Sequence, residues 1–373
     1  MRVTIVGAGA IGGLAGAWMT MAGENVELVD RWEEHVRAMQ RDGLFIDGLR
    51  GEHRVKVKAL TPAELEGPLE MVFVSCKSHD TRSVIELIKP FLTENSTVVS
   101  FQNGMNEELI GSIIGPEMVL GGIPDYGGAL VDPGHLEFVH PGVAYVGEMD
   151  GSITNRAREA QRLLNHHVET ELTTNIIGRL WAKQCHMTQV VMTALVDAPI
   201  NQVLRDEKVR HLGVSIIAEA IRVSDAAGVT LPESGSVGQT IQPTRCRSGT
   251  PEDTRRLVDD LGIWVESSHR HQEEQEAAGT HRYVKKASGM WWDIYYRKRA
   301  SETKGISGAL IEQADALGVA VPLNKKTVEL VYELEEGKRA SGTQNLDELY
   351  AYAQENGLLL PMGPLLTEQV PAT

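Results

Sequence analysis

Short apolar runs alternate with helical patterns through the first half of the chain. Residues 2–6, 26–29, 71–76 and 96–101 are rich in β-branched and other apolar side chains, and each run predicts a buried strand. Residues 14–22 follow the first run with a helical pattern, and helical stretches also precede the third and fourth runs. Strands that alternate with helices are typical of βαβ units, so the pattern predicts a parallel sheet.

The alternation ends in a glycine-rich segment. Residues 121–147 alternate apolar and polar positions, and HLEFVHPGVAYVG at residues 135–147 predicts a hairpin at the edge of the sheet. We expect this α/β domain to extend over residues 1–176.

Helical periodicity dominates the rest of the chain. Apolar residues recur with the helical period in residues 212–228 and 308–318, and each stretch ends at a glycine. We therefore expect a second, mostly helical domain at residues 177–373.

Length and charge narrow the class of protein. A chain of 373 residues exceeds what one hydrophobic core usually supports, which also favours two domains. The formal net charge of -15 argues against nucleic acid or an anionic membrane as the main partner. No apolar run approaches the ~20 residues of a membrane span, and the N-terminus lacks the pattern of a signal peptide. Three widely spaced cysteines fit a reduced, cytoplasmic location and form no CxxC metal site.

A glycine motif, GAGAIGG, lies between the first predicted strand and the first predicted helix. Gly7, Gly9 and Gly12 give the spacing GxGxxG. In a dinucleotide-binding fold the first glycine allows a sharp turn, the second lets a pyrophosphate approach the backbone, and the third lets helix and strand pack closely. The N–H groups at the helix start, at Ala10 and Ile11, would bind the phosphates. A glycine turn without a ligand is the alternative, and we favour a dinucleotide.

The end of the second predicted strand bears on which dinucleotide is bound. Asp30 lies 18 residues beyond Gly12, where such folds place the acid that binds the adenosine ribose. Its carboxylate would repel a 2′-phosphate, whereas Arg31 could pair with that phosphate. We expect NAD, with NADP possible.

Five segments of the chain, in the same order, resemble those of the ketopantoate reductase family. They are GAGAIGG at 7–13, SCKSHDT at 75–81, FQNGMNEE at 101–108, LWAKQ at 180–184 and, more weakly, residues 301–324. The resemblance implies an α/β N-terminal Rossmann dinucleotide-binding domain and an all-helical C-terminal domain of the 6-phosphogluconate-dehydrogenase-like type, with the active site in the cleft between them. It also implies reduction of a 2-oxo acid to a 2-hydroxy acid with a nicotinamide cofactor, and a homodimer.

The resemblance assigns roles to four residues. Lys183 would be the general acid that protonates the carbonyl oxygen, because an ammonium stabilises a developing alkoxide. Asn103 would contact the substrate oxygen and the nicotinamide side, Glu302 the substrate hydroxyl, and Lys77 the cofactor. Without the resemblance, Lys183 and Lys77 read as surface lysines, Asn103 as part of a turn, and Glu302 as a solvated helix-start residue.

The chain also departs from the family. Met187 and Val191 stand four and eight residues after Lys183, where the family usually has asparagines. Gly289 aligns with a serine that holds the substrate carboxylate, and the adjacent Ser288 could replace it. These changes favour a substrate with an apolar body, because an apolar pocket leaves polar substrate groups without partners at roughly 1–3 kcal/mol each. We therefore expect Met187, Val191 and Ser288 to line the substrate pocket. Lys304 also replaces a residue that is usually acidic.

Two further stretches exceed the length expected for the family. Residues 232–288 form an insertion, for which we favour a lid or an oligomer contact. Its His269, His271 and His281, with Cys246, do not make a strong zinc signature, so we expect no metal site. The tail after Lys338 includes LDELYAYAQEN, which predicts one helix.

The aromatic run MWWDIYY at 290–296 fits a helix core at least as well as a pocket.

Three functions fit these observations. The leading one is a nicotinamide-dependent oxidoreductase that acts on a 2-oxo or 2-hydroxy acid, or a related secondary alcohol, other than pantoate. The second is a pantoate-forming reductase that uses NADPH. The third is a non-catalytic dinucleotide-sensing protein, which would leave the match at Lys183, Asn103 and Glu302 unexplained.

Overall fold

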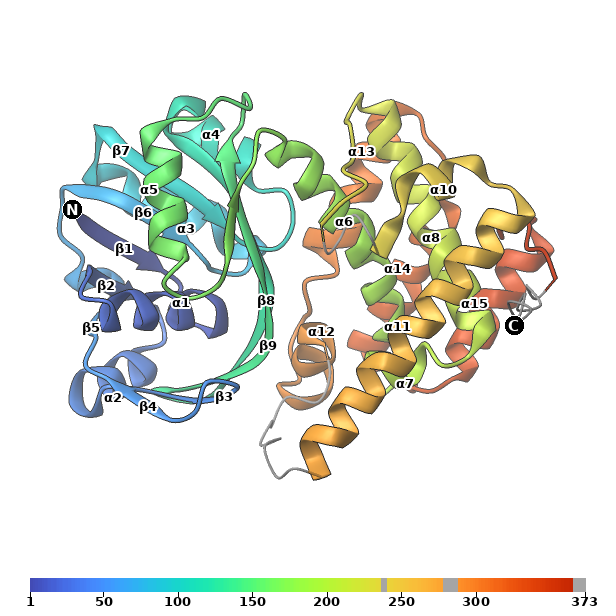
Figure 1. Ribbon diagram of the computed structural model, residues 1–373, viewed down its shortest axis with the longest axis horizontal. Helices are drawn as coiled ribbons and strands as arrows, with labels where there is room; N and C mark the ends of the chain where they lie inside the picture. The colour runs from blue at the N-terminus through green and yellow to red at the C-terminus, as the bar shows by residue number, and fades with distance from the viewer. Residues whose placement is uncertain (236–239, 278–287, 365–373) are drawn as a thin grey trace, which may run out of the picture. The chain divides into compact units, whose positions relative to one another are not determined.

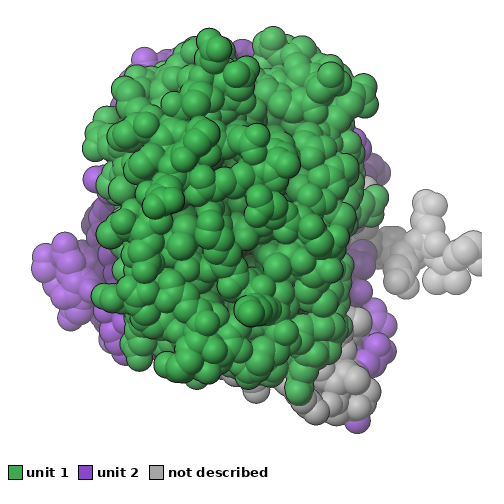
Figure 2. All heavy atoms as spheres, turned by 90° about the vertical axis from the view of Figure 1, so that its left-hand side faces the viewer, with its two compact units in different colours: residues 1–180, 281–285 green, residues 181–280, 286–373 purple. Residues whose placement is uncertain are grey.

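The computed structural model describes residues 1–235, 240–277 and 288–364 (Figure 1). These residues divide into two compact units, unit 1 with residues 1–180 and unit 2 with the described residues from 181 onward. Figure 2 shows unit 1 in green and unit 2 in purple.

A ten-stranded sheet forms the centre of unit 1. Its order is β4-β3-β9-β8-β7-β6-β1-β2-β5, and β10 pairs with β9. The five strands β7, β6, β1, β2 and β5 are parallel to one another, as the alternation of strands and helices predicts. The strands are β1 (Arg2–Val6), β2 (Asn25–Val29), β3 (Leu44–Gly48), β4 (His53–Val55), β5 (Lys58–Leu60), β6 (Leu69–Val74), β7 (Leu92–Phe101), β8 (Val119–Asp132), β9 (His135–Glu148) and β10 (Thr170–Leu172).

Helices cover both faces of this sheet. Side chains alternate between the faces of a strand, so Val3 and Ile5 of β1 enter the core beneath α1, α2 and α5, while Val6 enters the core beneath α3 and α4. Each face is therefore buried, which is why the central strands read as continuous apolar runs. The helices are α1 (Ala10–Met21), α2 (Glu33–Asp42), α3 (Thr81–Ile88), α4 (Glu107–Ile114) and α5 (Asn155–Leu164).

The expected hairpin at residues 135–147 is wrong. These residues lie in one continuous strand, β9, which pairs with β8 along one side and with β3 and β10 along the other. Pro141 and Gly142 lie opposite Tyr126, where β9 carries an extra residue. A bulge tolerates a proline because it interrupts the ladder of hydrogen bonds.

The sequence patterns also missed four short strands, β3, β4, β5 and β10. β3, β4 and β5 lie between α2 and β6, where we expected a helical stretch directly before the strand. They are five, three and three residues long, too short to give a period-2 signal of their own.

Unit 2 is helical throughout its described residues. Its elements are the latter part of α6 (Ile176–Thr193), then α7 (Ile200–Val203), α8 (Glu207–Ala226), α10 (Pro243–Ser248), α11 (Pro251–Ala277), α12 (Gly289–Trp291), π-helical turns at Trp292–Tyr296 and Lys304–Gly308, α13 (Ala309–Leu317), α14 (Pro322–Glu335) and α15 (Gln344–Glu355). α8 is buried on most of its surface and contacts α10, α11, α13, α14 and α15. The expected fold class, a Rossmann domain followed by a helical domain, is confirmed.

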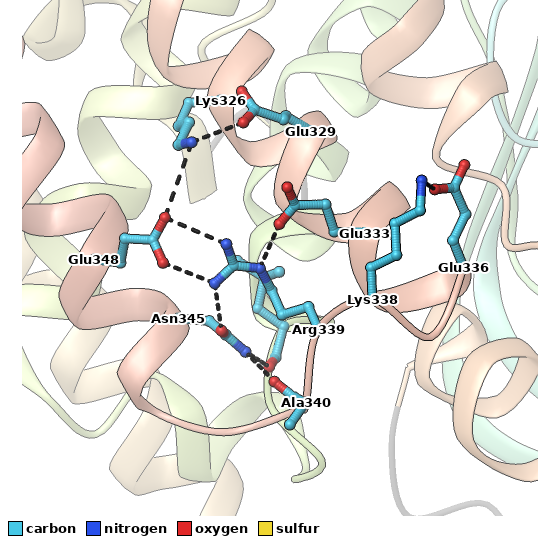
Figure 3. Close-up of polar contacts among 10 residues, drawn as sticks. Lys326, Glu329, Glu333, Glu336, Lys338, Arg339, Ala340, Asn345 and Glu348 are labelled. Atoms are coloured by element: carbon cyan, nitrogen blue, oxygen red, sulfur yellow. Dashed lines mark hydrogen bonds and ion pairs between the residues drawn. The ribbon is translucent and has the colours of Figure 1, made fainter.

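Polar side chains join the last two helices of unit 2. The guanidinium of Arg339 donates to Glu333 of α14 and to Asn345 and Glu348 of α15 (Figure 3). Asn345 in turn donates to the carbonyl oxygens of Leu195 and Ala340. The predicted helix after Lys338 is therefore present, as α15, and is anchored to its neighbours. No helix among the described residues is long and apolar enough to cross a membrane.

Candidate functional site

Two glycines of the GxGxxG motif are required by the fold of unit 1. Gly7 has a φ of +103°, and a Cβ there would lie 2.7 Å from the Cys76 nitrogen. A Cβ at Gly12 would lie 2.2 Å from the carbonyl oxygen of Gly7 and 2.8 Å from the Ile5 side chain. The first glycine therefore permits the turn after β1, and the third permits the close packing of α1 on β1.

Gly9 differs from both. Its φ is -70°, which any residue adopts, and a Cβ built on it would meet nothing within 4 Å. Gly9 is the N-cap residue of α1 and offers no side chain to the N–H groups that begin the helix at Ala10 and Ile11. Open space beside a bare helix N-terminus fits a pyrophosphate, which needs backbone donors and close approach.

The loop that carries Gly9 is held through both main-chain polar groups of Ala8. The Ala8 N–H donates to Asp30 Oδ2 at 2.8 Å, and the Ala8 carbonyl accepts from His35 Nε2 at 3.0 Å. The Gly134 N–H donates to His35 Nδ1 at 2.9 Å, so the ring proton resides on Nε2. Burial lowers the pKa of His35, which keeps it in this neutral form. The sequence patterns gave no signal for His35, because its partners lie 27 and 99 residues away.

Asp30 and Arg31 already have partners within unit 1. The second carboxylate oxygen of Asp30 accepts from the Trp32 N–H at 2.9 Å. Each carboxylate oxygen has a further lone pair, so Asp30 can still accept from a ribose hydroxyl. Arg31 forms an ion pair with Asp80 at 2.8 Å, although its side chain is 73% exposed.

The structure brings the SCKSHDT and FQNGMNEE segments together at one end of the sheet. Lys77 is half-buried and precedes the 3-10 turn Ser78–Asp80, and Asn103 follows β7. The Ser78 hydroxyl donates to the Asn103 carbonyl oxygen at 2.5 Å. The expected cofactor-side lysine and the expected substrate-contacting asparagine thus lie on joined loops of unit 1.

Lys183 and Glu302 belong to joined elements of unit 2. Lys183 is half-buried on α6, and Glu302 is buried. Gln184, next to Lys183, donates to the Ile306 carbonyl oxygen at 2.6 Å, and the Ile306 N–H donates to the Glu302 carbonyl oxygen at 3.0 Å. The buried Gln184 therefore fixes α6, which carries Lys183, against the turn that begins at Glu302.

The expected pocket residues differ in their surroundings. Met187 lies one turn beyond Lys183 on α6 and is half-buried, whereas Val191 is completely buried in the apolar core of unit 2. Met290 and Ile294 of the run at 290–296 pack in the same core, whereas its aromatic side chains range from buried Trp292 to Tyr296, which is 57% exposed. The Ser288 hydroxyl accepts from the Trp291 N–H at 3.1 Å and so caps α12.

The histidines of the insertion give no metal site among the described residues. His269 lies on α11 and contacts Glu273 one turn away at 3.1 Å. Cys246 is buried, and its thiol donates to the Ile241 carbonyl oxygen. The side chain of His271, and all of His281, lie outside the described part of the chain. Within that part, no group of three or more potential ligands is close enough to hold a metal.

Sequence comparison shows similarity to one family over most of the chain. The family model described as ketopantoate reductase PanE/ApbA matches residues 3–151, and its C-terminal counterpart matches residues 175–335. The 2-dehydropantoate 2-reductase of Archaeoglobus fulgidus is 28% identical over 338 residues, which are 90% of this chain and 98% of the relative. The enzyme of the same name from Pyrococcus horikoshii is 27% identical over 87% of this chain and 94% of the relative.

Solved structures show the same similarity. A PanE/ApbA family ketopantoate reductase from Ralstonia eutropha JMP134 superimposes with a TM-score of 0.70 at 25% identity, covering 91% of this chain and 100% of that one. The ternary structure of D-mandelate dehydrogenase with NADH and anilino(oxo)acetate gives a TM-score of 0.73 at 19% identity, covering 90% and 99%. The latter is a likeness of fold.

Proposed function

The chain belongs to the ketopantoate reductase family, and from that premise we propose that it transfers hydride between NAD(H) and a 2-oxo or 2-hydroxy acid with an apolar or aromatic body. The family and its named relatives make it an NAD(P)-dependent oxidoreductase that acts on CH–OH groups. We propose in addition which cofactor it prefers, which substrate it takes and what each site residue does.

The surroundings of Gly9 support binding of the dinucleotide at the start of α1. When bound, the nicotinamide supplies the hydride. Gly9, Ala10 and Ile11 would receive the pyrophosphate, and Asp30 the adenosine ribose. NAD is favoured over NADP because the Asp30 carboxylate repels a 2′-phosphate and because Arg31, the cation that could bind this phosphate, is paired with Asp80. NADP is the second option, since an exposed ion pair is worth at most about 1 kcal/mol.

Three residues would carry the chemistry. The Lys183 ammonium would donate a proton to the carbonyl oxygen as hydride arrives, and the same amine would accept it in the reverse direction. The Asn103 amide would donate to that oxygen, and the Glu302 carboxylate would accept from the product hydroxyl. Lys77 would contact the cofactor on the loop joined to Asn103.

The single observation that carries the substrate proposal is Met187. It retains accessible surface one turn after Lys183, so its side chain lies on the same helix face as the ammonium. A thioether at this position cannot donate a hydrogen bond to a substrate hydroxyl, whereas an apolar substrate gains about 25 cal/mol for each Å² it buries. Val191 supports the packing of this face from within the core.

Ketopantoate itself is the second candidate substrate. It is favoured by the names of the relatives at 28% and 27% identity, each of which matches nearly its full length. If ketopantoate is the substrate, Ser288 and residues of the insertion would have to replace the hydrogen bonds of the missing asparagines.

A substrate panel with both cofactors tests the proposal. We expect phenylglyoxylate, phenylpyruvate or 2-oxo-3-methylbutanoate to be reduced with a higher kcat/KM than ketopantoate, and with NADH preferred to NADPH. Lys183→Ala should lower kcat by about 10²–10⁴-fold while cofactor affinity is retained. Met187→Asn should shift the ratio of kcat/KM values towards ketopantoate.

Three results would count against it. Reduction of ketopantoate by the unaltered enzyme with a kcat/KM of about 10⁴ M⁻¹s⁻¹ or more, exceeding that of every other acid in the panel, would favour the second candidate. Full turnover by Lys183→Ala would remove that residue from the mechanism. Tighter binding of NADPH than of NADH would show that Arg31 outweighs Asp30.

A further inference from the structure

A chain of buried hydrogen bonds encloses the loop of Asn103. Gln102 Nε2 donates to Thr81 Oγ1 at 2.9 Å, and Thr81 Oγ1 donates to Asn106 Oδ1 at 3.1 Å. Asn106 Nδ2 then donates to the carbonyl oxygen of Asn103 at 3.0 Å. Because Gln102 and Asn103 are adjacent, the chain of hydrogen bonds closes on itself around the loop.

The direction of each donor in this ring is fixed by its neighbours. A carbonyl oxygen only accepts, so Asn106 must turn its NH₂ group towards Asn103 and its oxygen towards Thr81. Gln102 is oriented in the same way, because its NH₂ group also donates to the Cys76 carbonyl oxygen at 2.8 Å. The single hydroxyl proton of Thr81 is therefore left for Asn106.

The ring is shielded from water. Thr81 is 0% exposed, Gln102 4% and Asn106 5%. Hydrogen bonds at such positions are costly to leave unmade, so the ring holds one arrangement. Gly104, which follows Asn103, has a φ of +86° and no side chain to anchor the loop.

We propose that Thr81 and Asn106 are positioning residues that act through Asn103. They hold the main chain of Asn103, and Ser78 adds a second donor to the same carbonyl oxygen. Fixing this peptide limits the positions that the Asn103 side chain reaches, and a polar group must be placed within about 0.5 Å to stabilise a reacting oxygen. The inference rests on the proposed function, because it assumes that Asn103 contacts the substrate.

The matched pair Thr81→Val and Thr81→Ser tests it. Valine keeps the shape of threonine but removes the hydroxyl, whereas serine keeps the hydroxyl. We expect Thr81→Val to lower kcat/KM by about tenfold or more, with the dissociation constant of NADH changed by less than about threefold. Thr81→Ser should restore most of the activity. Both are measured with the best 2-oxo acid of the panel, alongside thermal unfolding.

Thr4→Val controls for loss of a buried hydroxyl in the same unit. Thr4 is also 0% exposed, and its hydroxyl donates to Glu27 rather than to the Asn103 loop. We expect this variant to lower thermal stability without lowering kcat/KM per folded molecule. Equal losses of kcat/KM in Thr4→Val and Thr81→Val would overturn the proposal, because they would show a general effect of stability.

A double-mutant cycle with Asn103→Ala separates a positioning role from an independent one. If Thr81 acts through Asn103, then Thr81→Val should have no further effect on kcat/KM once Asn103 is alanine. An additive loss would overturn the inference. If Asn103→Ala alone leaves kcat/KM unchanged, the proposed role of Asn103 fails, and the inference fails with it. If Thr81→Val does not fold, Ser78→Ala takes its place in the cycle, because it removes the other donor to the same carbonyl oxygen.

Discussion

Gly7, Gly9 and Gly12 belong to one motif, yet a methyl group would meet different surroundings at each. At Gly9 it would enter open space at an ordinary φ, so Gly9→Ala should leave the free energy of unfolding within about 0.5 kcal/mol of the unaltered protein. The methyl would occupy the space proposed for the pyrophosphate, so NADH affinity should fall by about tenfold or more. Fluorescence titration with NADH and thermal unfolding measure the two effects.

Gly12→Ala provides the contrast. Its methyl would lie 2.2 Å from the Gly7 carbonyl oxygen, so it should lower thermal stability whether or not cofactor is present. If Gly9→Ala bound NADH as tightly as the unaltered protein, the pyrophosphate site would lie elsewhere.

The candidate site was predictable from the sequence only where its signals are local. The glycine motif and Asp30 fall within one βαβ unit, so their spacing alone places them near a dinucleotide. His35, Thr81 and Asn106 carry no such signal. Each acts through a hydrogen bond to a residue that is close only after the sheet has formed, and a single buried His, Thr or Asn in a sequence gives no hint of its partner.

At the level of elements, the difference between local signals and long-range contacts also explains which strands the sequence predicts. The central strands are buried on both faces and read as continuous apolar runs, and residues 2–6 match β1 in full. The alternating, glycine-rich pattern of residues 135–147 predicts a hairpin, but these residues form one strand that pairs with β8, β3 and β10. Pairing with distant strands, rather than the local sequence, therefore determines that this segment is one continuous strand.

One helix start in unit 2 depends on a side chain from another helix. Glu219 of α8 is 2% exposed and accepts from the N–H groups of Leu323 and Asn324, each at 3.0 Å, at the beginning of α14. Burial raises the pKa of Glu219, so the ionised form depends on these donors. Glu219→Ala would leave the donors buried without an acceptor, and it should lower the free energy of unfolding by roughly 1–3 kcal/mol.

Glu329→Ala on α14 is the matched control, because Glu329 is exposed and should change stability by less than about 0.5 kcal/mol. Denaturant unfolding followed by circular dichroism compares the two variants. Equal stability of Glu219→Ala and the unaltered protein would mean that water or a neighbouring group satisfies the start of α14.

At the scale of the whole molecule, pH acts on stability through groups whose pKa differs between the folded and unfolded chain. His167 is 1% exposed and packs against the rings of Trp18, Tyr126 and Phe138. Neither of its ring nitrogens has a hydrogen-bond partner among the described residues. Burial lowers its pKa from 6.5 to about 3, so the folded protein holds this ring neutral where the unfolded chain would protonate it.

Acid should therefore destabilise the protein through His167. Above pH 6.5 the ring is neutral in both states and its titration does not change stability, but below it the unfolded chain binds a proton that the folded protein does not bind until the pH nears 3. Over that range the free energy of unfolding falls by about 1.4 kcal/mol per pH unit from this group alone.

His167→Phe keeps an aromatic ring in the cluster and removes the titration. We expect the difference in stability between His167→Phe and the unaltered protein to shift in favour of the variant by roughly 1–2 kcal/mol between about pH 7.5 and about pH 5. Denaturant unfolding at both values measures the difference, in which the other buried histidines cancel because both proteins contain them. A constant difference between the two proteins at all pH values would show that His167 is protonated, or hydrated, in the folded state.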